Sequence, residues 1–169
     1  MEHMDIFQGG VSVSRVVSGG GLSLKSDLGE CLQPYNHIFV VVDRHVVMNS
    51  SVVYDLVQEF LGKGVPVKVV DVSEGRKTMD TVLDICSWLL EQGADRDAIV
   101  LAVGGGITTD MSGFAASIYK RGVRYANVPT TLLAQVDAAL GGKTGVNHEK
   151  YKNILGVICQ PEFTYLCPP

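Results

Sequence analysis

The sequence predicts an α/β fold in which a mainly parallel sheet is covered by helices on both faces. Apolar, β-branched runs alternate along the chain with segments of helical periodicity, which is the order that builds parallel sheets. Three consecutive glycines join one of these runs to a helical segment, as at the ligand-binding edge of many open sheets. With 169 residues, 46% of them hydrophobic and 19% charged, the chain can bury the core of one domain.

The expected elements follow from these patterns. Apolar runs predict strands at residues 11–17, 37–42, 66–70, 99–103, 125–128 and 163–166, and helical periodicity predicts helices at 50–61, 78–91 and 109–119. The second helix has Val82, Ile85 and Leu89 at helical spacing, and Gly93 is expected to end it. Because no linker or repeat divides the chain, residues 1–169 are expected to form a single domain.

One segment departs from this alternation. Residues 138–153 are rich in glycine and lysine and have little periodicity. A segment of this length without regular structure usually binds a ligand or moves. We therefore expect a long functional loop here, and expect it to be the most mobile part of the chain.

Charge and composition exclude several classes of protein. A formal net charge of −4 disfavours nucleic acid and membrane surfaces, which attract basic proteins. No apolar run approaches the length of a spanning helix, and the first residues lack the order of an export signal, so a cytoplasmic location is expected. Cys31, Cys86, Cys159 and Cys167 lack metal-site or dithiol spacing and are expected to stay reduced, and no metal site is predicted within the chain.

The triple glycine predicts a diphosphate site. Glycines let the backbone approach a phosphate, and free N–H groups at the start of the helix, expected near Thr108, bind its oxygens. The dinucleotide fingerprint of the Rossmann fold fails at Thr109, where Gly or Ala is required, and a tight turn that merely needs small residues is the alternative. Asp110 is expected in the first helical turn, where it could accept hydrogen bonds from a ligand hydroxyl. The whole loop comprises Gly104, Gly105, Gly106, Ile107, Thr108, Thr109 and Asp110.

A second glycine-rich segment ends like a phosphate-binding P-loop, at residues 141–144. The P-loop motif requires glycine where this chain has Asp137, so an ATPase is rejected. Asp137 and Lys143 on one flexible loop suit a polyanionic substrate that carries hydroxyls, although a solvated loop lysine is the alternative. Arg121 could bind an anion, but a lone surface arginine is the more common case.

Further polar residues follow predicted strands. Thr130 and Thr131 could hold a nicotinamide amide or a ribose, and either could equally cap the next helix. Glu74 and Lys77 could bracket a ribose or adenine, or form an exposed ion pair of little energetic value. Asp43 ends a strand where acidic residues often bind a ribose hydroxyl, although a helix-entry role is as common.

Taken together, these segments resemble the central block of the 3-dehydroquinate synthases. The resemblance rests on GGGITTD at residues 104–110, YKRGVRY at 119–125 and VPTTLLAQVD at 128–137. It continues through GGKTGVNH at 141–148 and residues 152–161, and so covers about sixty continuous residues. Asp43, Glu74 and Lys77 support it more loosely upstream.

The resemblance implies an enzyme of the shikimate pathway. Its substrate would be a sugar phosphate, 3-deoxy-D-arabino-heptulosonate 7-phosphate, converted to 3-dehydroquinate with loss of phosphate, and NAD would be used and regenerated. The family also uses a divalent metal, Zn or Co, held by a glutamate and two histidines of a helical C-terminal domain, which are expected beyond Pro169. A homodimer is implied as well.

The resemblance also assigns roles to residues by position. NAD contacts would come from the glycine loop together with Asp43, Glu74, Lys77, Thr130, Thr131, Lys143 and Lys152, and substrate contacts from Asp137, Lys143 and Asn153. Arg121 would reach the substrate phosphate across the dimer. Two departures bear on these roles: the Thr109 side chain is expected to narrow the approach to the diphosphate, and His45 stands where an asparagine often assists Asp43.

Other families remain as alternatives. The glycine block is similar to that of cyclases that form valiolone or inosose precursors and, more distantly, to glycerol dehydrogenases and iron-dependent alcohol dehydrogenases. Outside enzymes, a phosphoacceptor receiver domain would also place aspartates such as Asp43 and Asp71 after strands, but Arg44 stands where that class has a second acid. An isolated nucleotide-binding module is a further alternative.

Overall fold

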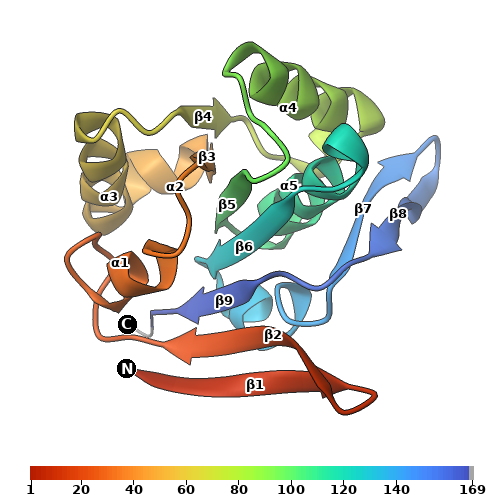
Figure 1. The fold of residues 1–169 in the computed structure, drawn as a ribbon. Coiled ribbons are helices and arrows are strands. Elements are labelled where there is room, and N and C mark those ends of the chain that lie inside the picture. Colours follow the sequence, from red (N-terminus) through yellow and green to blue (C-terminus); the bar gives the residue numbers. More distant parts are fainter. Residues whose placement is uncertain (168–169) are drawn as a thin grey trace.

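The computed structural model describes residues 1–167, and a seven-stranded, mostly parallel sheet forms its centre (Figure 1). The strands are β1 (Glu2–Gln8), β2 (Val11–Ser18), β3 (Ile38–Asp43), β4 (Val67–Val70), β5 (Ile99–Gly104), β6 (Arg124–Pro129) and β9 (Phe163–Leu166), in the spatial order β1-β2-β9-β6-β5-β3-β4. Neighbouring strands are parallel except for the antiparallel pair β1 and β2. The predicted α/β class and the predicted parallel strands are therefore confirmed.

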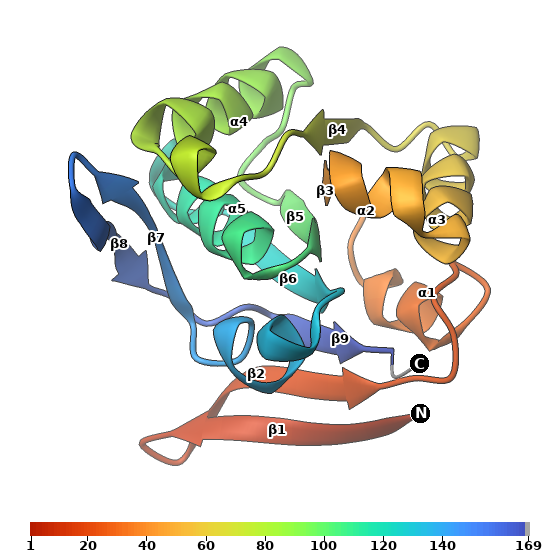
Figure 2. The same ribbon diagram turned by 180° about the vertical axis from the view of Figure 1, so that it is seen from behind.

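Helices cover both faces of this sheet, as the two opposite views show (Figures 1 and 2). The helices α4 (Met79–Glu91) and α5 (Gly106–Ile118) pack on one face. The other face carries α1 (Asp27–Leu32), α2 (Arg44–Asn49) and α3 (Ser51–Gly62). Short helical turns lie at Glu74–Arg76, Tyr119–Arg121 and, in the π conformation, Ala134–Ala138. The resulting three-layer arrangement is Rossmann-like.

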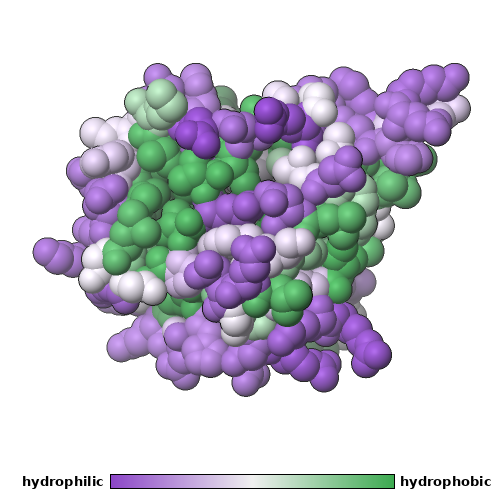
Figure 3. Space-filling view, turned by 90° about the horizontal axis from the view of Figure 1, so that it is seen from above, coloured by the Kyte–Doolittle hydropathy of each residue, from purple (hydrophilic) through white to green (hydrophobic). Residues whose placement is uncertain are grey.

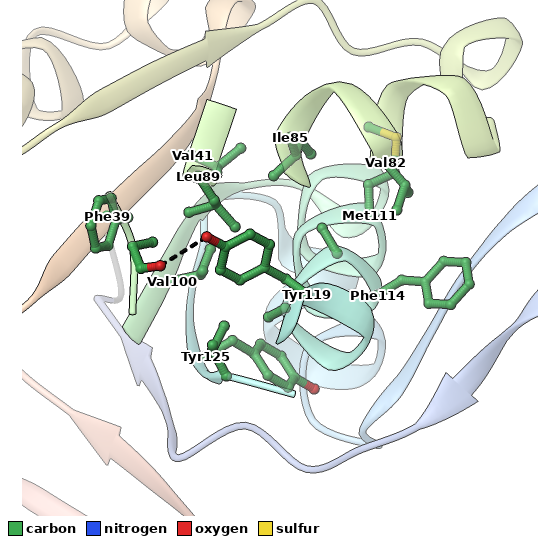
Figure 4. Packing of buried hydrophobic residues seen from close by; sticks show 14 of the residues in the cluster. Phe39, Val41, Val82, Ile85, Leu89, Val100, Met111, Phe114, Tyr119 and Tyr125 are labelled. Carbon is green, nitrogen blue, oxygen red and sulfur yellow. Dashed lines mark hydrogen bonds between the residues drawn. The ribbon is translucent and has the colours of Figure 1, made fainter. Parts of the chain in front are cut away.

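Alternate residues of the central strands point to opposite faces, so each face has its own core. Under α4 and α5, Val41 and Val100 pack against Ile85 and Met111 (Figure 4). The Tyr119 hydroxyl in the same core donates a hydrogen bond of 2.8 Å to the carbonyl oxygen of Ala94, which satisfies both buried polar groups. Strands β3, β5 and β6 are buried on both sides, which explains the nearly continuous apolar sequences of β3 and β5.

The ends of α4 follow from its capping residues. The Thr78 side chain accepts a hydrogen bond from the Thr81 N–H at the start of the helix. At the other end, Gly93 has a φ of +75°, its N–H donates to the Leu90 carbonyl, and the Ala94 N–H donates to the Leu89 carbonyl. This pair of bonds is the Schellman motif, so the prediction that Gly93 ends the helix is confirmed.

Gly93→Ala is expected to reduce the free energy of unfolding by about 1 kcal/mol, because an L side chain disfavours this left-handed backbone conformation. No atom lies within 4 Å of the added Cβ, so the effect should come from the backbone alone. Chemical denaturation measures it. Gly62→Ala is the matched control, because Gly62 also ends a helix with open space around it but has no positive φ, and it should be neutral or slightly stabilising. An equal effect in both variants would contradict the assignment.

Several predictions of local structure were wrong or incomplete. The strand β1 and the six-residue helices α1 and α2 were not predicted, because short or exposed elements carry little hydrophobic periodicity. The helix α5 begins at Gly106 and not near Thr108 or Thr109, so Asp110 lies beyond the first helical turn. The last correction concerns residues 138–153.

Residues 138–153 are not a long loop but lead into an antiparallel hairpin of β7 (Lys143–His148) and β8 (Tyr151–Ile158). The turn residue Glu149 has a φ of +54°, a conformation that glycine or asparagine usually provides. Every residue of β8 is exposed, so the strand lacks the apolar alternation that marks a buried face. These two features hid the hairpin from the sequence pattern.

The surface mixes polar and apolar side chains. On the face shown in Figure 3, apolar areas lie beside bands of hydrophilic residues. None of the helices within residues 1–167 is long and apolar enough to cross a membrane.

Candidate functional site

The carboxyl ends of the parallel strands bring several predicted residues to one edge of the sheet. The glycine loop follows β5, and Thr130 and Thr131 follow the neighbouring strand β6. Register pairs Gly104 with Pro129, and the Thr130 N–H donates a 2.9 Å hydrogen bond to the Gly104 carbonyl. In open α/β sheets, ligands bind at this edge.

The backbone geometry of the glycine loop explains its composition. A Cβ added to Gly104 would lie 2.5 Å from the Thr108 hydroxyl oxygen, so a side chain at this position is excluded by the protein itself. Gly105 is the N-cap of α5 and offers no capping side chain, and the first helical bond runs from the Thr109 N–H to the Gly105 carbonyl. The preceding N–H groups therefore have no partner within the helix and can bind an anion. This geometry is consistent with both interpretations of the loop, as a tight turn that needs small residues and as an anion-binding site.

The structure corrects the expectation for Thr109. Its side chain is 2% exposed, and its hydroxyl donates a 3.0 Å hydrogen bond to the Gly106 carbonyl within the helix. A side chain buried in this way does not narrow the approach to the loop. Threonine in place of the glycine or alanine of the dinucleotide fingerprint therefore does not block a ligand from reaching the glycine loop.

Lys77 and Asp110 form a buried ion pair at the centre of the site. The Lys77 Nζ lies 2.6 Å from Asp110 Oδ2 and donates a second 2.6 Å bond to Asn153 Oδ1. The lysine is 5% exposed, so the alternative of an exposed Glu74–Lys77 pair is wrong. Burial raises the pKa of the Asp110 carboxyl, and the hydrogen bond and positive charge of Lys77 oppose that rise.

Glu74 does not pair with Lys77 but contacts two residues of the hairpin. Its Oε1 accepts a 2.9 Å hydrogen bond from Asn147 Nδ2 and lies 3.8 Å from Lys152 Nζ. Asn147 was quoted only as part of the family block and was not assigned a role. No sequence pattern identifies it, because two of its partners, Glu74 and the Lys77 carbonyl, are about seventy residues away and meet it only in the folded chain.

The residues predicted to contact substrate meet in one cavity. It has a volume of about 480 Å³, and Asp137, Lys143 and Asn153 line it together with Asp110. Asp137 reaches it from the π turn, and Lys143 and Asn153 reach it from the hairpin. One cationic side chain, two carboxylates and an amide can bind a ligand that carries both anionic groups and hydroxyls.

Other predicted residues have different surroundings. The Asp43 carboxylate accepts a 2.9 Å hydrogen bond from the His45 N–H and caps α2, which is the helix-entry alternative, and it lines a separate cavity of about 350 Å³. The Thr131 hydroxyl accepts from the Ala134 N–H and also acts as a cap. Thr130 Oγ1 is buried without a hydrogen-bond partner among the described residues. Arg121 lies at the opposite end of α5 from the glycine loop, and within this chain it does not join the site.

A larger cavity, about 690 Å³, lies elsewhere, between the β1–β2 hairpin and α1. Four of its polar side chains are paired with one another: Arg15 bonds to Asp5 at 2.8 Å, and Tyr35 bonds to Glu162 at 3.3 Å. It contains none of the residues at the carboxyl edge of the sheet. Size alone therefore does not identify the functional site.

A three-layer α/β sheet, a glycine loop at its carboxyl edge and a polar cavity beside that edge define the class of α/β domains that bind ligands outside the strand ends. The sequence model of the N-terminal domain of 3-dehydroquinate synthase matches residues 67–168. The chain therefore belongs to the 3-dehydroquinate synthase family.

Individual relatives agree with this membership. The chain is 45% identical over 127 residues to the 3-dehydroquinate synthase of Geotalea uraniireducens (strain Rf4), an alignment that covers 72% of this chain and 35% of the relative. It is 42% identical over 144 residues to that of Buchnera aphidicola subsp. Baizongia pistaciae, covering 79% of this chain and 41% of the relative. The alignments thus cover between 25% and 41% of the length of curated relatives such as these.

Solved structures of similar fold include sugar-phosphate cyclases. The 2-epi-5-epi-valiolone synthase of Streptomyces hygroscopicus subsp. jinggangensis 5008, with NAD⁺ and Zn²⁺ bound, is 32% identical with a TM-score of 0.80, over 97% of this chain and 45% of that one. A 2-deoxy-scyllo-inosose synthase complexed with carbaglucose-6-phosphate, NAD⁺ and Co²⁺ is 29% identical with a TM-score of 0.75, over 90% and 42%. An iron-containing alcohol dehydrogenase from Thermotoga maritima, 15% identical with a TM-score of 0.69 over 90% and 45%, shares the fold alone.

Proposed function

We propose that this chain provides the NAD site and part of the substrate site of a 3-dehydroquinate synthase, which converts 3-deoxy-D-arabino-heptulosonate 7-phosphate to 3-dehydroquinate and phosphate. The observation that carries the proposal is the cavity in which Asp110, Asp137, Lys143 and Asn153 meet. Membership of the family supports the same reaction. In this proposal residues 1–169 are one NAD-binding domain of a longer enzyme, because 127 aligned residues make up only 35% of the first relative, which makes that relative about twice as long as this chain.

NAD is the proposed cofactor. Two solved relatives carry NAD⁺, and the unpaired N–H groups at the start of α5 suit a diphosphate. The buried hydroxyl of Thr130 has no partner within the described residues, which fits a polar ligand group at this edge. The proposed contacts are residues 104–110 with Asp43, Glu74, Lys77, Thr130, Thr131, Lys143 and Lys152.

NAD would supply the temporary oxidation of a ring hydroxyl and the return of the hydride. The side chains of this domain would bind and orient the substrate. The Lys143 ammonium is suited to an anionic group of the sugar phosphate, and Asp137 and Asn153 are suited to its hydroxyls. The buried Lys77–Asp110 pair would fix Asn153 beside the cofactor, since Lys77 Nζ bonds to both Asp110 and Asn153.

A metal does not fit the residues described here. Within residues 1–167, no group of three His, Cys, Asp or Glu side chains could hold an ion. The similar cyclases were solved with Co²⁺ or Zn²⁺. We infer that a divalent metal, Zn²⁺ or Co²⁺, is bound by another part of the longer enzyme.

Contacts with the rest of such an enzyme are also proposed. Leu132, Leu133 and Val136, near the π turn, are 76%, 69% and 63% exposed, and Ile158 at the rim of the cavity is 80% exposed. A C-terminal domain that closes the site would bury this apolar surface. Arg121 stands about 20 Å from the glycine loop along α5, judged from the helical rise, so we propose that it serves the site of a second subunit in a homodimer.

Phosphate release tests the function. The complete enzyme with NAD and a divalent metal is expected to release inorganic phosphate from the heptulosonate phosphate, while absorbance at the NADH wavelength shows no net accumulation. Net NADH formation from glycerol or another simple alcohol would contradict the proposal in favour of the dehydrogenases. Phosphate release only from substrates of the valiolone-forming or inosose-forming cyclases would assign one of those activities, which the structural similarity supports as a second candidate.

A further inference from the structure

Asn147 connects the segment before α4 to both strands of the hairpin. Its backbone N–H donates a 2.9 Å hydrogen bond to the Lys77 carbonyl. Its Nδ2 donates to Glu74 Oε1 at 2.9 Å, and its Oδ1 accepts from the Asn153 N–H at 2.9 Å. One side-chain amide therefore uses its donor on Glu74 and its acceptor on the backbone of β8.

The segment that Asn147 holds needs an external constraint. Asn153 has a φ of +52°, a left-handed conformation that asparagine tolerates better than most residues but that interrupts the extended backbone of β8. The register of the hairpin shifts between Val146 and His148, so Asn147 stands outside the regular ladder and its amide is free to bond sideways. Strand β8 is exposed along its whole length, so polar contacts hold Asn153: Lys77 Nζ bonds to its side chain at 2.6 Å, and Asn147 Oδ1 bonds to its backbone N–H.

We propose that Asn147 is a positioning residue that sets Glu74 on the NAD side and Asn153 on the substrate side through separate atoms of one amide. This inference rests on the proposed function for the identity of the two ligands. The Oδ1 of Asn147 would hold the backbone of Asn153, which keeps the Asn153 side chain in the cavity. The Nδ2 of Asn147 would hold the Glu74 carboxylate. The two roles are separable by chemistry, because aspartate at position 147 keeps the acceptor and loses the donor.

The experiment compares Asn147→Ala with Asn147→Asp in the complete enzyme. Asn147→Ala should raise both the Kd for NAD and the KM for the sugar phosphate by about tenfold, the size expected for one lost hydrogen bond to a charged or strained group. Asn147→Asp should raise the Kd for NAD by a similar factor, because two carboxylates then repel, while the KM for the sugar phosphate stays near the wild-type value. Asn36→Ala, an exposed asparagine before β3 at the opposite edge of the sheet, is the control and should change neither.

Amide hydrogen exchange of the ligand-free protein provides a readout that does not depend on the proposed function. Exchange of the Asn153 N–H should accelerate about tenfold or more in Asn147→Ala and stay slow in Asn147→Asp. Unchanged exchange in Asn147→Ala, or parallel losses of both affinities and of thermal stability in the two variants, would overturn the positioning role. If the wild-type enzyme binds neither ligand, the proposed function fails, and the exchange result alone then decides whether Asn147 holds Asn153.

Discussion

Lys77→Met is expected to lower the free energy of unfolding by about 3 kcal/mol, because it leaves the Asp110 carboxylate buried without its cationic partner. The side chains of Lys77 and Asp110 are only 7% and 19% exposed, so water cannot replace the lost ammonium fully. The expected loss lies at the lower end of the range for broken buried pairs because Asp110 keeps some contact with solvent. Urea denaturation near neutral pH measures it.

The loss should depend on pH in a defined direction. Burial raises the pKa of Asp110 above its ordinary value of 3.8, and Lys77 is the influence that opposes the rise, so the variant should raise this pKa further. A carboxyl whose folded pKa exceeds its unfolded value loses stabilisation as pH rises from the unfolded value through the folded one. The difference between variant and wild type should therefore be small at acidic pH and grow toward neutrality.

A double variant separates charge from packing. Lys77→Met combined with Asp110→Asn removes both charges and should recover much of the lost stability, since a neutral amide has a smaller desolvation penalty than a carboxylate. A double variant as unstable as Lys77→Met would show that the lysine stabilises the fold by packing alone. A loss independent of pH would also contradict the role given to Asp110.

Gly156→Ala is expected to cost about 3 kcal/mol, at the upper end for overpacking, and to abolish binding of the sugar phosphate. The added Cβ would lie 2.0 Å from the Thr144 carbonyl oxygen and 2.7 Å from the Gly145 Cα, so the backbone of the hairpin itself must move. Gly145 is paired directly with Gly156, and both line the cavity with Lys143 and Asn153. Separating the strands would displace both of these proposed substrate contacts.

Denaturation and sugar-phosphate titration measure the two effects of Gly156→Ala. Gly20→Ala is the matched control, because a Cβ there meets nothing within 4 Å and the residue has no positive φ. The control should keep wild-type stability and binding. If Gly156→Ala binds the sugar phosphate normally, the hairpin does not form part of the substrate site.

Much of the main sheet was predictable from sequence because burial leaves a strong pattern. Strands β3 and β5 lie between two helical layers, and their sequences are therefore nearly continuous apolar runs. Helix α4 carries its own start and stop signals in Thr78 and Gly93. The short or exposed elements β1, α1, α2 and β8 lack such a pattern, and they were missed.

The sequence by itself determined the α/β class, the glycine loop at a strand end and, through the family block, the residues of the candidate site. Only the tertiary structure decided their partners: Lys77 bonds to Asp110 and Asn153, Thr109 is buried, and Asn147 joins Glu74 to the hairpin. The physical reason is range. Periodicity, capping and turn chemistry act between near neighbours in the chain. The bonds of Lys77 to Asp110 and Asn153 and of Asn147 to Glu74 join residues 33 to 76 positions apart. Only the Thr109 bond to Gly106 and the Asn153 N–H bond to Asn147 are local.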